Sequence, residues 1–182
     1  QHLESTDIDT PSEILTRTST MPVVQVRGEP SLEPNHVYIV PSAHDVVIEA
    51  GVLKVLPRDE RAPALAPVDC FLQSLAKACR ERAIGIVLSG TGHDGTSGLE
   101  AIRAGGGLTF AQDESARHDG MSRSAIAAGC VDFILSPGRM AQELKCLSQP
   151  REKVLADDPR DSTRIDLYRK VTRRMVLNEV EE

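Results

Sequence analysis

A regular alternation of strand and helix patterns between residues 83 and 147 constrains the fold of this chain most strongly. The segment AIGIVLS (83–89) is apolar almost throughout, as is typical of a parallel strand covered on both faces. Two further strand patterns, LTFAQ (108–112) and CVDFILS (130–136), alternate with segments in which apolar residues recur at helical spacing. The resulting order β-α-β-α-β-α predicts an α/β fold: a doubly wound parallel sheet of Rossmann-like type, with helices on its faces.

The residues before this alternation predict smaller elements. PSEILTRT (11–18) is expected to form a short helix that starts at its proline, and MPVVQV (21–26) and HVYIV (36–40) are expected to form strands. The two alternating runs of DVVIEAGVLKVL (45–56) flank an Ala-Gly pair and predict a β-hairpin. The segment 67–83 places its apolar residues on one face of an amphipathic helix.

The composition of the chain changes after Leu147. Residues 148–163 are charged, marked by proline and poor in apolar residues, which is typical of a linker. Residues 164–182, RIDLYRKVTRRMVLNEVEE, have the spacing of a basic amphipathic helix. We therefore expect one domain over residues 1–147, a linker over 148–163 and a C-terminal helical tail over 164–182.

Charge and composition exclude several function classes. The net charge is -6 and aromatic residues make up 3% of the chain, which disfavours a nucleic-acid partner. No apolar run approaches the length of a membrane span and no secretory signal is visible, so we expect a cytoplasmic protein without membrane insertion. The cysteines have no metal-ligand spacing and are expected to be reduced thiols, so neither a metal nor a cofactor is predicted: Cys70, Cys79, Cys130 and Cys146.

A glycine-rich loop follows the first strand of the alternating region. Gly90, Gly92 and Gly95 fit the pattern G-x-G-x-x-G between a predicted strand and a predicted helix. This arrangement is typical of a dinucleotide-binding loop, and Asp113 lies near the end of the next strand, where a ribose-binding acid is expected. Against this interpretation stands Asp94, because a carboxylate at the helix start competes with a phosphate for the same amide donors.

Asp94 has two further interpretations. Held at the carboxyl end of a strand by backbone amides and the helix dipole, it could orient and stabilise a histidine in a nucleophile–His–Asp relay. Alternatively, it could be no more than the N-cap of the helix that begins near Thr96. From the residues alone, the nucleotide site, the relay and the cap all stay open.

Four ordered motifs make the chain resemble a known family. They are G-x-G-x-D-G (90–95), GG-x-T-x-A-Q-D (106–113), A-R-x-D-G-M (116–121) and A-I-x-x-G-x-V-D (125–132). Together with the opening QHL and the segments EPNHVYIVP and PVDCFLQSLA, they resemble the catalytic domain of the chemotaxis receptor protein-glutamate methylesterases of the CheB type. The resemblance covers about residues 1–147.

The resemblance implies an activity, a partner and a site. Family members hydrolyse methyl esters of glutamate side chains on chemoreceptors and release methanol, and some also deamidate glutamine. They use a Ser-His-Asp triad, whose histidine and aspartate correspond to His2 and Asp94. The implied partners are methylated chemoreceptor helices. The residues that correspond to the loops around the active site are Gly90, Thr91, Gly92, Gly95, Gly120 and Met121.

The sequence also departs from the family pattern. The family's serine stands in a G-A-S-x-G-G turn before the Q-H motif, and this turn is not among the 182 residues. Ser122 replaces the proline that usually follows Gly-Met. We therefore expect a sheet that is incomplete at its N-terminus and a triad that lacks its serine, with a non-catalytic receptor-binding remnant as the alternative function. The tail resembles the basic N-terminal helix of receptor methyltransferases, which implies an esterase–methyltransferase fusion.

Overall fold

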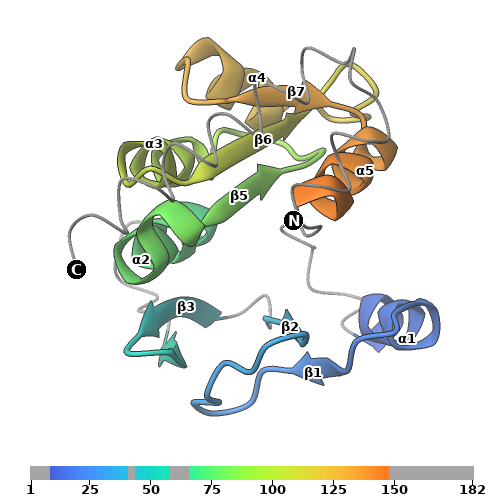
Figure 1. Cartoon of the computed structure of the whole chain (residues 1–182), viewed down its shortest axis with the longest axis vertical. Helices are drawn as coiled ribbons and strands as arrows, with labels where there is room; N and C mark the ends of the chain where they lie inside the picture. Colours follow the sequence, from blue (N-terminus) through green and yellow to red (C-terminus); the bar gives the residue numbers. More distant parts are fainter. Residues whose placement is uncertain (1–8, 41–43, 58–65, 148–182) are drawn as a thin grey trace.

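The central sheet has three parallel strands in sequence order. A computed structural model describes residues 9–40, 44–57 and 66–147, and β5 (Ile84–Val87), β6 (Leu108–Gln112) and β7 (Phe133–Leu135) pair in the order β5-β6-β7 (Figure 1). Each strand is followed by a helix. These are α3 (Thr96–Ala104), α4 (Gly120–Ala127) and α5 (Pro137–Leu147). The predicted β-α-β-α-β-α order of an α/β fold is thus confirmed.

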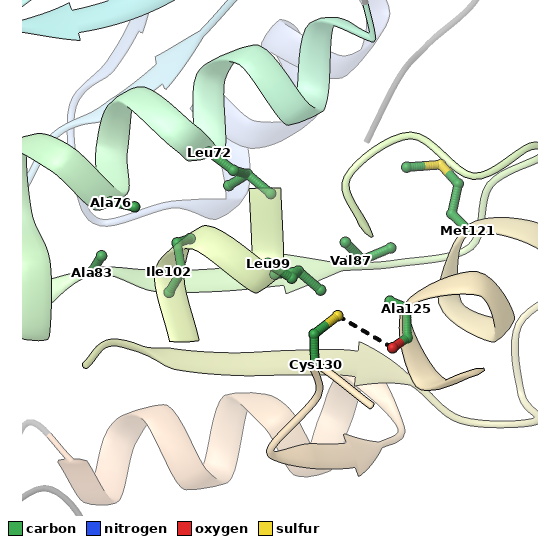
Figure 2. Packing of buried hydrophobic residues seen from close by; sticks show 9 residues of the cluster. All are labelled: Leu72, Ala76, Ala83, Val87, Leu99, Ile102, Met121, Ala125 and Cys130. Atoms are coloured by element: carbon green, nitrogen blue, oxygen red, sulfur yellow. Dashed lines mark hydrogen bonds between the residues drawn. The ribbon is translucent and has the colours of Figure 1, made fainter. Parts of the chain in front are cut away.

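Helices cover both faces of this sheet, as the doubly wound prediction requires. Val87 points to one face, where α2 (Pro67–Cys79), α3 and α4 pack over a shared cluster (Figure 2). Ile86, one residue earlier, packs with Phe110 of β6 and Met140 of α5 on the other face. This opposite placement follows from the two-residue period of a strand. Phe110, Leu99 and Ile102 are fully buried, so both faces contribute to the hydrophobic core.

The N-terminal elements form separate, smaller sheets. Helix α1 (Asp9–Thr18) precedes β1 (Val23–Gln25), which pairs in parallel with β2 (Val37–Ile39). Strands β3 (His44–Glu49) and β4 (Val52–Pro57) form the predicted hairpin. Within the described residues neither pair is hydrogen-bonded to β5–β7. The parallel strands are therefore divided between two sheets, one with β1 and β2 and the other with β5, β6 and β7.

The hairpin turn and its packing follow from the sequence. Ala50 and Gly51 both have positive φ angles, of 50° and 78°, which a two-residue hairpin turn of type I′ requires. The buried side of the hairpin packs against Phe71 of α2. In addition, the amide of Ile48 donates a hydrogen bond of 2.9 Å to the Ser74 hydroxyl, which joins the hairpin to the same helix.

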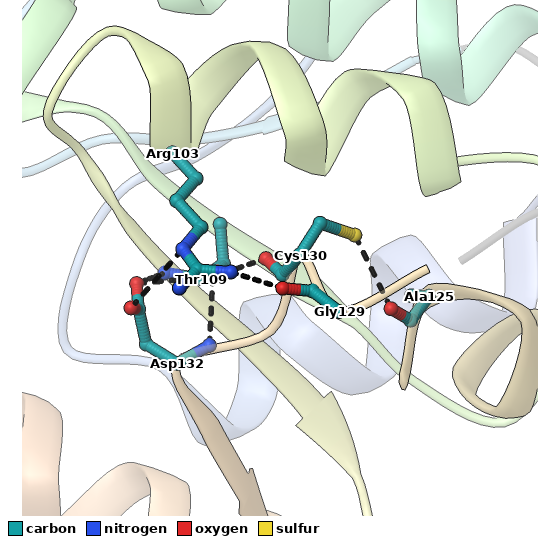
Figure 3. Close-up of polar contacts among 6 residues, drawn as sticks. All are labelled: Arg103, Thr109, Ala125, Gly129, Cys130 and Asp132. Carbon is teal, nitrogen blue, oxygen red and sulfur yellow. Dashed lines mark hydrogen bonds and ion pairs between the residues drawn. The ribbon is translucent and has the colours of Figure 1, made fainter. Parts of the chain in front are cut away.

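A buried carboxylate joins the amino ends of β6 and β7. Asp132, with a side chain only 2% exposed, accepts a hydrogen bond of 3.1 Å from the amide of Thr109 (Figure 3). Its own amide donates to the Thr109 hydroxyl at 2.9 Å. The Arg103 guanidinium reaches this cluster from α3, with Nε 3.8 Å from Asp132 Oδ1, and donates to the carbonyl of Gly129. These contacts tie α3 to the amino end of the sheet.

Several predictions fall on residues that the structure does not describe. They are His2, the linker over 148–163 and the tail helix over 164–182, so the expected domain division stays a prediction. Among the residues that are described, no helix has both the length and the apolar character needed to cross a bilayer.

Candidate active site

Two loops meet at the carboxyl ends of β5 and β6, the edge at which open α/β sheets place their sites. The amide of Gly90, in the first loop, donates to the carbonyl of His118 in the second at 2.8 Å. The amide of Met121 donates back to the carbonyl of Gly90 at 3.1 Å. The amide of His118 also donates to the Ser89 hydroxyl at 3.0 Å. The two loops are therefore held side by side by main-chain contacts.

Gln112 fastens the base of both loops. This side chain at the end of β6 is only 8% exposed. Its Oε1 accepts a hydrogen bond of 2.9 Å from the amide of Ser89, and its Nε2 donates to the hydroxyl of Ser115 at 3.1 Å. These hydrogen bonds make Gln112 a support for the two loops.

Close packing accounts for the predicted loop glycines. A Cβ atom on Gly120 would lie 2.9 Å from both the amide nitrogen and the carbonyl oxygen of Gly92, and one on Gly90 would lie 2.3 Å from Met121 Sδ. Gly95 has a φ of 96° at the N-cap of α3, a left-handed conformation that favours glycine. The pattern G-x-G-x-x-G thus allows two loops and a helix start to pack closely.

Asp94 caps a helix other than the one that follows it. Its Oδ2 accepts a hydrogen bond of 3.1 Å from the amide of Val68, and its Oδ1 accepts one of 2.9 Å from the amide of Asp69. Both amides belong to the first turn of α2, where Pro67 has no N–H to offer. The interpretation of Asp94 as N-cap of the helix near Thr96 is therefore wrong. The N-cap of α3 is Gly95, which makes no side-chain capping bond.

A second carboxylate, that of Asp69, links α2 to α3 in the opposite direction. Oδ1 of Asp69 accepts a hydrogen bond of 2.7 Å from the amide of Gly98, in the first turn of α3. Asp69 of α2 thus binds an N-terminal amide of α3, and Asp94, in the loop before α3, binds N-terminal amides of α2; the helix dipole favours negative charge at both places. No motif in the sequence singled out Asp69. An acid in the first turn of the predicted helix was the available signal, but its partner lies 29 residues away.

These hydrogen bonds between the carboxylates and the helix amides weaken the case for a nucleotide-binding site at this loop. The amides of Val68, Asp69 and Gly98 already bind carboxylates, so a phosphate there would compete with two negative groups. Asp113 accepts a hydrogen bond of 3.0 Å from the amide of Ser115, as in a tight turn. Hydrogen bonding from Ser115, first its side chain and then its amide, lowers the pKa of Asp113. No group of potential metal ligands gathers within the residues described.

Burial raises the pKa of the Cys70 thiol in α2, and the negative charges of Asp45 and Asp94 raise it further. Because the thiolate is the reactive form of cysteine, both effects disfavour nucleophilic reaction at this thiol.

The structure brings most of the predicted loop residues together. Gly90 contacts Met121, Gly120 packs against Gly90 and Gly92, and a Cβ on Gly95 would lie 3.8 Å from Met121 Cε. Thr91 is exposed at the tip of the first loop. His2 lies outside the described residues, so the geometry between it and Asp94 is untested.

Comparisons with known proteins identify the family. Residues 1–144 match the model of the CheB methylesterase family, and the chain belongs to that family. A crystal structure of the Thermotoga maritima CheB methylesterase catalytic domain superposes with a TM-score of 0.72 at 26% identity, covering 81% of this chain and 80% of that one. The resemblance predicted from the motifs and the α/β fold are both confirmed.

Curated relatives support the same assignment and are longer than this chain. A protein-glutamate methylesterase/protein-glutamine glutaminase of Geobacter sulfurreducens is 34% identical over 152 residues, which are 79% of this chain and 40% of the relative. An uncharacterized 104.1 kDa protein from the hypE 3' region of Rhodobacter capsulatus is 44% identical over 128 residues, which are 70% of this chain and 13% of the relative. The chain thus spans less than half of either relative.

Proposed function

We propose that this chain is part of a protein-glutamate methylesterase of chemotaxis-type signalling. Its substrates are glutamate methyl esters on chemoreceptor helices, and its products are glutamate and methanol. The observation that carries the proposal is the position of Asp94, whose carboxylate is held by two amides at the carboxyl edge of the sheet in a chain of the CheB methylesterase family.

The proposed chemistry follows from a carboxylate in this position. Asp94 would accept a hydrogen bond from His2, fix the orientation of the imidazole and stabilise its protonated form. The two amides leave lone pairs free on both oxygens of Asp94, so a third donor can still bind. His2 would remove the proton from a serine hydroxyl as that oxygen attacks the ester carbonyl. It would then give this proton to the departing methoxide, which leaves as methanol.

We assign the nucleophile to the family's serine turn, which is not among these 182 residues. The acyl group formed on that serine would be released by water, with His2 again as the base, to give glutamate. Loops 89–95 and 113–121 would flank the reacting ester, because both lie at the edge where Asp94 stands. The test of the proposal therefore uses the natural polypeptide that contains these residues.

The test is methanol release from methylated chemoreceptor membranes. We expect Asp94→Asn to lower kcat by about 10³- to 10⁴-fold, because the amide neither orients nor stabilises the charged imidazole as the carboxylate does. The matched control is Asp132→Asn, which alters a carboxylate that also binds a backbone amide but lies at the opposite end of the sheet. At a temperature where this variant is folded, its kcat should stay within about threefold of the parent.

Two results would contradict the proposal. Full activity of a folded Asp94→Asn protein would exclude Asp94 from the relay. A folded parent protein that releases no methanol but co-sediments with receptor membranes would favour the non-catalytic receptor-binding alternative.

A further inference from the structure

We propose that Asp69 is a positioning residue for Asp94. It would act by holding the start of α3, the helix that directly follows Asp94 in the chain. The effect on the Asp94 carboxylate can be measured by itself, whereas its consequence for catalysis rests on the function proposed above.

Hydrogen bonds close a ring that contains both carboxylates. The amide of Asp69 donates to Asp94 Oδ1 at 2.9 Å, while Asp69 Oδ1 accepts from the amide of Gly98 at 2.7 Å. The backbone of the five residues from Asp94 to Gly98 completes the ring. Asp69 is thus the only residue in the described structure that binds Asp94 with its main chain and α3 with its side chain.

Close packing makes this ring stiff. A Cβ on Gly98 would lie 2.5 Å from Leu72 Cβ, so the two helices touch almost backbone to backbone at this point. A Cβ on Gly95 would lie 3.1 Å from methyl groups of both Val68 and Val87. The first turns of α2 and α3 therefore have little room to slide, and the Asp69–Gly98 bond sets their relative position within a narrow range.

The ring predicts what removal of the Asp69 carboxylate would do. Without its acceptor, the Gly98 amide at the N-terminus of α3 loses a partner, and the first turn of that helix can fray. Asp94 precedes this turn directly, so fraying displaces its carboxylate from the amides of Val68 and residue 69. A small displacement of a group that orients a catalytic base lowers the rate of the chemical step more than it weakens substrate binding.

The experiment compares Asp69→Ala with a conservative variant and a matched control. Asp69→Asn keeps an oxygen that can accept from Gly98. Gln73→Ala removes a bond of 2.8 Å between Gln73 Nε2 and the Ser97 hydroxyl, which joins the same two helices without touching Asp94. The readouts are hydrogen exchange at the amides of residues 68 and 69, relative to the buried amide of Phe110, and kcat and KM for methanol release by the natural polypeptide.

We expect Asp69→Ala to speed exchange at residues 68 and 69 by about tenfold and to lower kcat by about tenfold, with KM within about twofold of the parent. Asp69→Asn should recover most of both losses, and Gln73→Ala should cause neither. If Asp69→Ala does not fold, Asp69→Ser, whose shorter side chain reaches Gly98 less well, takes its place.

The outcomes separate this inference from the proposed function. Exchange at residues 68 and 69 that stays unchanged while exchange at Gly98 rises would overturn the positioning role, whatever the activity. Failure of the Asp69→Asn variant to recover kcat would also overturn the positioning role of Asp69. Faster exchange together with full kcat in both Asp69→Ala and Asp94→Asn would support the positioning of the carboxylate and overturn the function proposed for Asp94.

Discussion

Asp94 and Asp132 are two aspartates at opposite ends of the same sheet, and both accept hydrogen bonds from backbone amides. Asp132, at the amino end, is almost completely buried and is also paired with Arg103 (Figure 3). Asp94, at the carboxyl end, is half-buried, and within the described structure it accepts hydrogen bonds only from two amides of α2. One carboxylate is enclosed by its partners, whereas the other keeps capacity for a further donor.

The comparison separates a structural carboxylate from one suited to chemistry. An enclosed and paired carboxylate stabilises the fold but has no contact to offer a substrate or a catalytic histidine. A carboxylate fixed by amides of a helix N-terminus is equally well oriented, yet it remains accessible. Loss of the Asp132 carboxylate should therefore mainly reduce stability, and loss of the Asp94 carboxylate should mainly reduce activity.

The largest effect on stability is expected from Asp132→Ala. This change leaves the amide of Thr109 without its acceptor and removes the ion pair with Arg103, which should lower the free energy of unfolding by about 2–4 kcal/mol. Asp94→Ala should cost about 1 kcal/mol, the usual effect of losing a helix cap. Urea unfolding of both variants measures the difference. Equal losses would remove the distinction between the two ends of the sheet.

A smaller effect is expected from Gly120→Ala at the carboxyl end. The added Cβ would meet main-chain atoms of Gly92, which cannot move aside as a flexible side chain can, so the two loops must separate. We expect a loss of about 1–3 kcal/mol in the free energy of unfolding. Gly138→Ala in α5 is the control, because a Cβ there meets nothing within 4 Å. Thermal unfolding that affects both variants alike would contradict the close loop contact.

The smallest effect concerns the pH dependence of Asp113. Hydrogen bonding from Ser115 lowers the pKa of this exposed carboxyl, so its contribution to stability is present above its ordinary pKa and is lost as the pH falls through the lowered value. Ser115→Ala should raise the pKa of Asp113 toward its ordinary value and make stability less sensitive to acid in that range. A carboxyl ¹³C NMR titration measures the pKa. An unchanged pKa in the variant would exclude Ser115 as the cause.

Much of the fold could be predicted because it depends on local patterns. The spacing of apolar residues predicted each helix of the alternating region, and the Ala-Gly pair predicted the hairpin turn that Ala50 and Gly51 form. Some predicted strands were longer than the observed ones, as β1 shows by covering only Val23–Gln25, whereas the strand predicted over 108–112 matches β6. Apolar patterns continue beyond the last ladder hydrogen bond, so strand ends are difficult to predict from such patterns.

The candidate site could be predicted only in part. The motifs singled out Asp94 and the glycines around it but left three interpretations of Asp94 open, of which the local cap was wrong, and Asp69 was overlooked. Neighbouring residues in sequence suggested a local cap. The actual hydrogen bonds join residues 25 and 26 positions apart, and no spacing rule covers such a contact.

By itself, the sequence determined the order of strands and helices, the hairpin and the family, because periodicity, turn residues and motifs are carried by neighbouring positions in the chain. Only the tertiary structure decided which helix each carboxylate caps and why Gly90 and Gly120 have no side chain. Those features arise where α2, α3 and the two loops pack against one another, and packing between distant segments depends on the whole fold.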